Sequence, residues 1–494
     1  MHGESRLHPW SWLFVLIQQL KQFVLPLLAI LVFGGRNADR ELWGALAPVI
    51  AMIVLVVIAV MRYFTYRYRI GADGLTVRSG WLHRSVRDIP YARIHNVVVH
   101  QSLLHRLFGV AEVRLESAGG EKPEAEMRVL SLAAAAQLEN LIRHRGAIAG
   151  TEAAMAAESP SDRLLELSTM EIIRLGLISN RGLVIVAAAF GAAWQIVPER
   201  RMANWVEHYA REAFGFASHL QWSWLGAAAV VLCALLAAIV FTRVLSIIQS
   251  LLQYHGFTLS EADRRLTVER GLLARVRSSV ARRRIQAWTL REGVLHRLFR
   301  RRSLRIDTAV AQKGNDERAL KVLAPIATPA QCDALIAHLL PVAAWPPPAW
   351  NGWPPRILWR IWWPSLLIAV VLAIGLFANR GSIAVLILLW PLVSLYAAYR
   401  QAVRSGYSVD DRLVAVRGGA WSRWWRFAEI DKLQAMRISR TPMDRWCGTA
   451  TLWLDTAGDN GLGPPLRLRF LALDDAIALQ QRLSQALAHR RLRW

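Results

Sequence analysis

Long runs of apolar residues recur along the chain in three closely spaced pairs. The runs fall at 12–33 and 43–62, at 179–197 and 223–248, and at 357–377 and 382–401. At 1.5 Å per helical residue, runs of this length can cross a hydrocarbon core of about 30 Å. The clearest run, at 43–61, contains no charged residue, whereas Lys21 interrupts the first. The pattern predicts six transmembrane helices arranged as three pairs.

Short stretches in which apolar and polar residues alternate follow each pair, as half-buried strands require. In the last third of the chain these stretches are "RLVAVRG", "WRFAEI", "KLQAMRIS", "ATLWLDTA" and "LRLRFLAL". Each strand-rich segment then ends in a predicted helix, at 131–145, 328–340 and 472–490. In the last helix Leu479, Leu483 and Leu487 recur every four residues and form one apolar face. Membrane helix pairs therefore alternate with small β-rich domains.

The three strand-rich segments align with one another without a gap, which identifies an internal repeat. Residues 80–118 and 271–309 share 12 identities in 39 positions, and residues 419–457 keep the same pattern with fewer identities. The identical columns are Gly80/Gly271/Gly419, Arg84/Arg275/Arg423, Arg106/Arg297/Arg445 and Ala118/Ala309/Ala457, and Glu116/Asp307/Asp455 form an acidic column. We predict that these signature residues are structural. The repeated arginine of the "HRLF" turn either pairs with a strand carboxylate or faces a ligand.

The apolar runs and the repeat together predict the domain organisation. The segments are an N-terminal tail with membrane pair 1 at 1–62, β domain 1 at 63–147, a linker and juxtamembrane helix at 148–178, membrane pair 2 at 179–250 with an extracytoplasmic loop at 198–221, β domain 2 at 251–341, a Pro/Trp-rich tether at 342–356, membrane pair 3 at 357–402 and β domain 3 at 403–494.

The net charge of the chain favours the same interpretation and orients it. A formal charge of +24 beside a hydrophobic content of 54% fits a protein whose apolar and basic residues are segregated. Only six of the 60 lysines and arginines lie in the segments that join the two helices of a pair. The positive-inside rule therefore predicts a multi-pass protein with both termini and all three β domains in the cytoplasm. The dispersed Cys233, Cys332 and Cys447 show no disulfide framework, as is typical of a reducing compartment.

Basic and aromatic residues occupy the same place in each copy, after the glycine that ends a strand. The three stretches are "WLHRSVR" at 81–87, "LLARVRSSVARRR" at 272–284 and "WSRWWR" at 421–426. Arginine is attracted to anionic lipids and tryptophan favours the membrane interface. One hypothesis places these hairpins against the inner leaflet, and the alternative is that they are simply solvated. The candidate lipid-facing residues are Trp81, Arg84, Arg87, Arg275, Arg282, Arg283, Arg284, Trp421, Arg423, Trp424, Trp425 and Arg426.

No motif for catalysis, phosphate binding or metal binding is visible, and we predict no catalytic residue, cofactor or metal. His95, His100 and His105 are spaced by five, which does not place three ligands on one face of a strand. The "HRLF" unit is predicted to pack Leu107 and Phe108 into the β domain. Nucleic acid is not an expected partner, because the charge is spread over three copies and there is no recognition motif.

The stretch "RSGWLHRSVRDIPYARIHNVVVHQSLLHRLFGVAEVRLESAG" resembles the bacterial pleckstrin-homology-like domain family. Three such copies alternating with three helix pairs resemble the YdbT-type membrane proteins of bacteria, over almost the whole chain. The third copy departs from the pattern, with Asp444 in place of the histidine and Trp446-Cys447 in place of Leu-Phe. The resemblance implies three barrels, each of two orthogonal sheets with a C-terminal helix, on a protein of the bacterial inner membrane. It implies no enzyme chemistry.

The predicted function is therefore binding. We expect a membrane-anchored scaffold or a sensor of envelope state, which contacts anionic lipids of the inner leaflet and a protein partner that the sequence does not identify. Capture of a peptide strand at an exposed sheet edge is one way to bind such a partner. The alternative is a carrier or channel in which the three repeated helix pairs surround a pathway. Mid-membrane acidic residues, which a proton-coupled carrier would be expected to show, are absent from the apolar runs.

Overall fold

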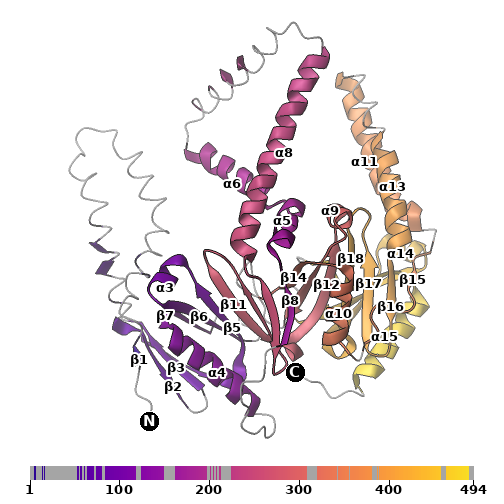
Figure 1. Cartoon of the computed structure of the whole chain (residues 1–494). Helices are drawn as coiled ribbons and strands as arrows, with labels where there is room; N and C mark the ends of the chain where they lie inside the picture. The colour runs from indigo at the N-terminus through magenta and orange to yellow at the C-terminus, as the bar shows by residue number, and fades with distance from the viewer. Residues whose placement is uncertain are drawn as a thin grey trace.

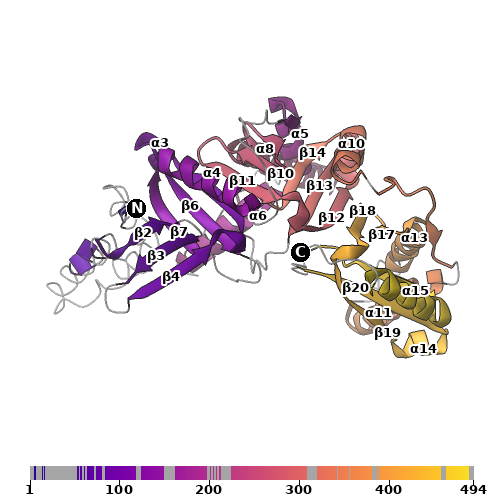
Figure 2. The ribbon, with the colours of Figure 1, turned by 90° about the horizontal axis from the view of Figure 1, so that it is seen from below.

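A computed structural model shows three similar β-rich units standing in a row beneath long helices (Figure 1). The structure describes residues 5–6, 64–71, 74–80, 84–117, 124–148, 162–196, 224–308, 320–341, 343–354, 357–380, 389–457 and 463–488, with isolated positions at 14–61, 201–212 and 387. Seen from below, the row runs from unit 1 through unit 2 to unit 3 (Figure 2).

Each unit contains the same order of elements, as the repeat predicts. Unit 1 consists of β2 (Arg67–Ile70), β3 (Gly74–Ser79), β4 (Ser85–Pro90), the 3₁₀ turn Tyr91–Arg93, β5 (Ile94–Gln101), α3 (Leu103–Leu107), β6 (Val110–Ser117), β7 (Ala125–Ser131) and α4 (Leu132–Ile148). Unit 2 consists of β9 (Thr258–Ala262), β10 (Arg265–Arg270), β11 (Arg275–Ala281), the 3₁₀ turn Arg282–Arg284, β12 (Ile285–Glu292), α9 (Val294–Leu298), β13 (Arg302–Thr308), β14 (Val322–Ala327) and α10 (Pro329–Leu339). Unit 3 consists of β16 (Gly406–Val409), β17 (Leu413–Gly418), β18 (Arg423–Glu429), the 3₁₀ turn Ile430–Lys432, β19 (Leu433–Ser439), α14 (Pro442–Trp446), β20 (Thr449–Thr456), β21 (Arg467–Ala472) and α15 (Leu473–Ala488).

The sheets do not close into barrels, which corrects the predicted fold. The third strand of a unit does not pair with the fourth strand of the same unit, because a 3₁₀ turn separates them. At the two joints between units, the fourth strand of one unit instead pairs with the third strand of the next. Two seven-stranded antiparallel sheets result, in the orders β7-β6-β5-β11-β10-β9-β8 and β14-β13-β12-β18-β17-β16-β15. A four-stranded sheet, β1-β2-β3-β4, and a three-stranded sheet, β19-β20-β21, stand at the two ends of the row. The units therefore share sheets, and the row is continuous.

The hydrophobic cores follow this arrangement. The inward faces of both sheets of unit 1 and of α4 form one cluster, which includes Leu75, Leu115 and Leu138. The core of unit 2 extends into unit 3, since Leu413, Ala415 and Phe427 belong to the same cluster as Trp288. The Trp288 and Phe427 rings stack in parallel at 6.3 Å across the β12–β18 pair.

An additional strand precedes each group of membrane helices and joins the first sheet of the unit that follows them. These strands are β1 (Ser5–Arg6), β8 (Asp162–Glu166) and β15 (Asn351–Gly352), which pair with β2, β9 and β16. The last two lie in the segments that were predicted as linker and tether. The strand before each group of helices and the strand after it are therefore neighbours in one sheet, so the chain leaves that sheet and returns to it at the same place.

Two helices in the described part of the chain are long and apolar enough to cross a membrane by themselves. They are Ala228–Tyr254 of α8 (Trp224–Tyr254) and Ile357–Gly375 of α11 (Ile357–Arg380). The helices α5 (Thr169–Ile178) and α6 (Arg181–Ile196) satisfy the same test only together, across a bend of 57°. The helix α13 (Leu389–Arg404) covers part of the sixth predicted span. The predicted spans 12–33 and 43–62 and the loop 198–221 lie outside the described residues apart from isolated positions, so six spans remain a prediction.

Small residues bring α8 close to α5 and α6. A Cβ at Gly176 would lie 2.5 Å from Ile247 Cα, and a Cβ at Gly182 would lie 1.9 Å from the carbonyl oxygen of Thr242. The Arg243 guanidinium donates to the carbonyl oxygens of Leu177 and Ser179, at 3.1 and 2.9 Å, where α5 ends.

Candidate functional site

Three short helices expose apolar side chains at equivalent places in the three units. We call α3, α9 and α14 the tip helices. Leu107 of α3 is 77% exposed, Leu298 of α9 is 75% exposed and Trp446 of α14 is 82% exposed, and these three positions coincide in the repeat. The prediction that Leu107 packs into the β domain is therefore wrong, whereas Phe108 does pack, against Phe14 and Val110. Each tip also touches a segment that was predicted to belong to the membrane or to lie beside it.

The tip of unit 1 contacts the first apolar run. The Phe14 ring lies 4.2 Å from the His105 ring and 6.0 Å from the Phe108 ring. Ser102 begins the tip helix, and its hydroxyl oxygen accepts a hydrogen bond from the His105 backbone N–H. Because Phe14 packs from outside the sheet, it connects the tip with the N-terminal segment.

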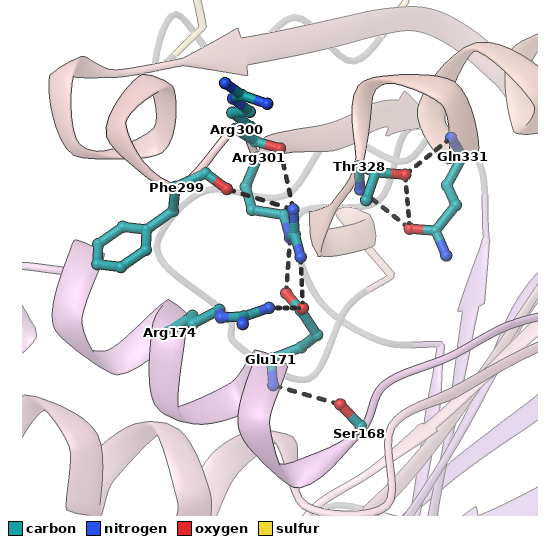
Figure 3. A network of polar contacts seen from close by, with 8 residues as sticks. All are labelled: Ser168, Glu171, Arg174, Phe299, Arg300, Arg301, Thr328 and Gln331. Atoms are coloured by element: carbon teal, nitrogen blue, oxygen red, sulfur yellow. Dashed lines mark hydrogen bonds and ion pairs between the residues drawn. The ribbon is translucent and has the colours of Figure 1, made fainter.

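The tip of unit 2 is anchored to the juxtamembrane helix α5, as Figure 3 shows. Arg301, directly after the tip, donates through Nε and Nη2 to the two carboxylate oxygens of Glu171, at 2.8 and 2.7 Å. Arg174 donates to the same carboxylate. The Glu171 carboxylate raises the pKa of the Arg301 guanidinium. A bidentate pair of this kind fixes direction as well as distance, so α9 is held against α5 in one orientation.

The tip of unit 3 is anchored to the first turn of α11. Arg360 donates to the Asp444 carboxylate at 2.7 Å, and Thr449 donates to it at 2.9 Å. Asp444 also accepts from the backbone and hydroxyl of Thr441, which begins α14 in a capping box. Burial would raise the pKa of Asp444, but the hydrogen bonds from Thr441, Arg360 and Thr449 outweigh it and lower the pKa to about 2. In contrast, burial lowers the pKa of the equivalent His296, which favours its neutral form.

A basic cavity of about 240 Å³ lies on the outer face of the first sheet of unit 1. Its lining residues are Arg67, Tyr68, Arg69, Thr76, Arg78, Val86 and Asp88. The Asp88 carboxylate accepts a hydrogen bond from the Thr76 hydroxyl at 2.5 Å. Three arginines in one shallow cavity suit an anionic group, and β2 begins only a few residues after the predicted span 43–62.

The second and third of the predicted basic–aromatic hairpins lie at the lower ends of α8 and α13. Gly271 and Gly419 have φ of 112° and 107°, and a Cβ at either would lie within about 2 Å of a carbonyl oxygen across the turn. The Gly271 and Leu272 N–H groups donate to the carbonyls of His255 and Leu252, at the end of α8. The Trp421 ring lies 5.7 Å from the ring of Tyr396 on α13. Gly80 also has a positive φ, of 103°, whereas Trp81 lies outside the described residues.

The other candidate lipid-facing residues divide into exposed and interface positions. Arg84, Arg87, Arg275 and Arg283 are exposed. Arg282 donates to the carbonyls of His338 and Leu339 at the end of α10, and burial beside Arg283 lowers the pKa of Arg284. Trp424 and Trp425 are partly buried on β18, where the Arg302 guanidinium lies 4.9 Å from the Trp425 ring. Arg426 is only 1% exposed and bonds Asp307 at 2.8 Å, so it is an interface residue.

The repeated "HRLF" arginine has a role that the sequence left open. Arg106 donates to the carbonyl of Leu272 at 3.0 Å, and Arg297 donates to the carbonyl of Trp421 at 2.6 Å. Each arginine therefore holds the β hairpin of the next unit, rather than a strand carboxylate of its own unit. Arg445, in the last unit, is exposed.

The acidic column also faces three different environments. Glu116 accepts a hydrogen bond from Asn96 at 2.8 Å inside unit 1, Asp307 binds Arg426 of the next unit, and Asp455 is exposed. The sequence of one unit does not predict these contacts, because each contact joins two units. The recurrence of the arginine at the same position in all three copies was the feature of the sequence that pointed to a shared role. Within the described residues, no cluster of three His, Cys, Asp or Glu side chains could hold a metal ion.

Comparison with known proteins agrees with the three-unit architecture. The profile of the bacterial PH domain family matches three times, at residues 15–146, 214–340 and 365–487. Each match contains part of a membrane segment as well as a unit. The chain is also similar to a transmembrane protein, YdbT, of Bacillus subtilis (strain 168), at 23% identity over 421 residues, which cover 81% of this chain and 83% of that protein. No solved structure matches the chain.

Proposed function

The chain belongs to the bacterial PH domain family, and from this premise we propose that it is a non-enzymatic scaffold or sensor of the bacterial inner membrane. It is a membrane protein in which three repeated PH domains accompany apolar helices. The proposal adds that the three domains lie on the cytoplasmic face with both termini, that six helices span in three pairs, and that the domains contact anionic lipids of the inner leaflet.

The exposed apolar tips are the observation that carries the proposal. A leucine or tryptophan that is at least three-quarters exposed, at the same place in all three units, has no structural role inside its own unit. Figure 1 shows α8 and α11 leaving the row on one side. The Glu171–Arg301 pair holds the tip of unit 2 against α5, which packs on α8, and the Arg360–Asp444 pair holds the tip of unit 3 against α11. Apolar side chains at that level would enter the interfacial layer of the bilayer.

Electrostatic attraction supports the same orientation. Arginine near an anionic leaflet gains roughly 1 kcal/mol per charge. The three arginines of the unit 1 cavity and the flanks of the membrane helices supply such charges. The tip helices then couple the state of the bilayer to the row, because two of them are fixed to membrane helices by ion pairs. This coupling of the tips to the helices supports a sensor or scaffold. No feature of the described helices specifically favours a carrier.

A fluorescent probe on a tip tests the proposal. In a chain freed of its three cysteines, Leu298→Cys is labelled with the polarity-sensitive dye NBD and reconstituted in nanodiscs that contain phosphatidylglycerol. We expect blue-shifted emission and strong quenching by nitroxide-labelled lipids. The matched control is Ser484→Cys, an exposed position towards the C-terminal end of α15, whereas the start of this helix touches the α14 tip through the Leu473 N–H and the Gly448 carbonyl. Equal emission and equal quenching at the two positions would contradict the lipid contact.

A further inference from the structure

The two contacts between units use one strand register. Against β11, β5 places Gln101 opposite Arg275 and Val97 opposite Ser279. Against β18, β12 places Glu292 opposite Arg423 and Trp288 opposite Phe427. When residues are matched through the repeat, these are the same pairs of positions. The fourth strand of one unit therefore pairs with the third strand of the next unit in the same register at both joints.

The two ends of the row present the same two kinds of strand with their outer edges open. Within the described strands, β4 is the last strand of the four-stranded sheet and β19 is the first strand of the three-stranded sheet. β4 is the third strand of unit 1, and the chain has no preceding unit to pair with it. β19 is the fourth strand of unit 3, and the chain has no following unit to pair with it. Open edges are templates for strand addition. One chain thus carries both halves of the contact that joins its own units.

The side chains that stabilise the internal contact are also present at the two ends. Arg426 of β18 crosses to the preceding unit, where it binds Asp307 at 2.8 Å and Thr289 at 3.3 Å. The repeat places Arg87 on β4 at the position of Arg426. It places Asp455 on β20 at the position of Asp307. Both side chains are exposed, at opposite ends of the row.

Further features of the two ends are complementary. The internal register, applied to β19 and β4, places Ile438 opposite Val86, and Val86 is 57% exposed. Arg445 is exposed beside β19, where Arg106 and Arg297 in the other units donate to the hairpin of the following unit.

We propose that a second copy of the chain occupies these edges, so that β19 of one chain pairs with β4 of the next and the row of units continues from chain to chain. The contact is heterologous and head to tail. α8 and α11 leave the row on the same side (Figure 1), so adding the next chain by the pairing that joins units 2 and 3 leaves its helices on the membrane side.

Like charges make this contact weaker than the internal ones. In the same register Arg440 stands opposite Arg84, where Glu292 stands opposite Arg423 inside the chain, with 3.8 Å between the charged groups. Arg437 stands opposite Arg87, where Thr289 stands opposite Arg426. Like charges directly opposite each other oppose pairing. The association is therefore reversible and depends on the concentration of the chain in the membrane.

Disulfide cross-linking between two differently tagged full-length chains tests the register. One chain carries Val86→Cys and the other Ile438→Cys, both in a background without native cysteines, and both are co-reconstituted in liposomes and oxidised. Opposed residues have Cβ atoms about 4.5–5.5 Å apart, which a small adjustment brings within disulfide reach. We expect a cross-linked dimer that carries both tags. Arg87→Cys with Ile438→Cys, whose side chains point to opposite faces, should give at least tenfold less.

Charge exchange then tests the chemistry of the contact. Asp455→Arg in the Ile438→Cys chain should lower the cross-linked yield about tenfold, because Arg87 would then face only arginines, and Arg87→Glu in the other chain should restore it. Arg440→Glu in the Ile438→Cys chain should raise the yield severalfold, because it removes the like charges of Arg440 and Arg84 from opposed positions. Three outcomes would each overturn the proposal. They are cross-linking between two Val86→Cys chains, a cross-linked yield that does not respond to the charge exchange, and the absence of any cross-linked dimer.

Discussion

Asp444 shows how a single residue changes the role of a repeated element. Units 1 and 2 have His105 and His296 at this position, and unit 3 has a carboxylate that is 3% exposed. The acid caps its own helix through Thr441 and at the same time binds Arg360 of α11. The departure from the repeat pattern, which weakened the assignment of the third copy from sequence alone, is thus an anchor between a PH domain and a membrane helix.

Replacing Asp444 with asparagine should loosen unit 3 from α11. The amide retains an acceptor for Thr441 but loses the charge that Arg360 needs, and breaking a buried ion pair costs about 3 kcal/mol. The pKa of Asp444 is about 2, below its ordinary value of 3.8. The carboxylate therefore stabilises the fold fully above about pH 4, and the stabilisation is lost as the pH falls towards 2.

Thermal unfolding in detergent across this pH range measures the effect. We expect Asp444→Asn to lower the melting temperature by the same amount from pH 5 to pH 7, with the difference shrinking below pH 4. The control is Asp411→Asn, whose partner Arg482 lies at 2.9 Å but whose side chain is 84% exposed. Exposed pairs contribute about 0–1 kcal/mol, so this variant should be nearly neutral. A pH-independent loss in Asp444→Asn would show that the charge is not responsible.

Among the elements, the crossing of α6 and α8 depends on one glycine. Gly182→Val should separate these helices, because any Cβ there would overlap the Thr242 carbonyl oxygen. The shift would also disturb Ser246, whose hydroxyl accepts from the Gly182 N–H at 3.2 Å. We expect a marked loss of thermal stability in detergent, by about 2 kcal/mol or more, as overpacking typically costs 1–3 kcal/mol.

Gly191→Ala provides the matched control, because it lies in the same helix with open space around its Cβ position. Alanine has the higher helix propensity, by about 1 kcal/mol, so this variant should be neutral or slightly stabilised. If both variants behaved alike, helix propensity and not close packing would govern the segment.

The sequence predicts individual elements better than their assembly. Local patterns locate the strands and the closing helices, so the helix expected at 328–340 is found at Pro329–Leu339. Local patterns do not specify which edge pairs with which, because the strand propensity of β5, β12 and β19 describes how their side chains suit a sheet and not which strand lies beside them. For the same reason Arg426 reads as a surface arginine in "WSRWWR", although in the structure it is buried against Asp307.

The tips could not be predicted for a different physical reason. Leu107 and Leu298 follow helical spacing in a short apolar turn, and such leucines normally pack inward in a soluble domain. Their exposure follows from the level at which α3 and α9 stand relative to the membrane helices. That level is set by distant contacts such as Arg301 with Glu171, 130 residues apart in the chain.

At the scale of the whole molecule, the shared sheets make the three units one mechanical row. The β12–β18 pair joins two hydrophobic clusters, and Arg426 lies inside the joint at 1% exposure. An opening of this joint would therefore release unit 3, together with the tip that binds α11, from units 1 and 2.

Arg426→Ala should open this joint selectively. Asp307 would lose its ion pair, and removing one partner of a buried pair costs about 3 kcal/mol, which corresponds to roughly a hundredfold more opening. Hydrogen exchange of the full chain in nanodiscs should then accelerate in Trp288–Glu292 and Arg423–Phe427, where the two strands pair, and remain unchanged in the β5–β11 pair. The matched variant is Arg423→Ala in the same strand, which loses only a 3.8 Å contact of a half-exposed guanidinium with Glu292 and should change exchange little. Acceleration spread evenly over all three units would mean that the row unfolds as one body and that its joints are not separate points of opening.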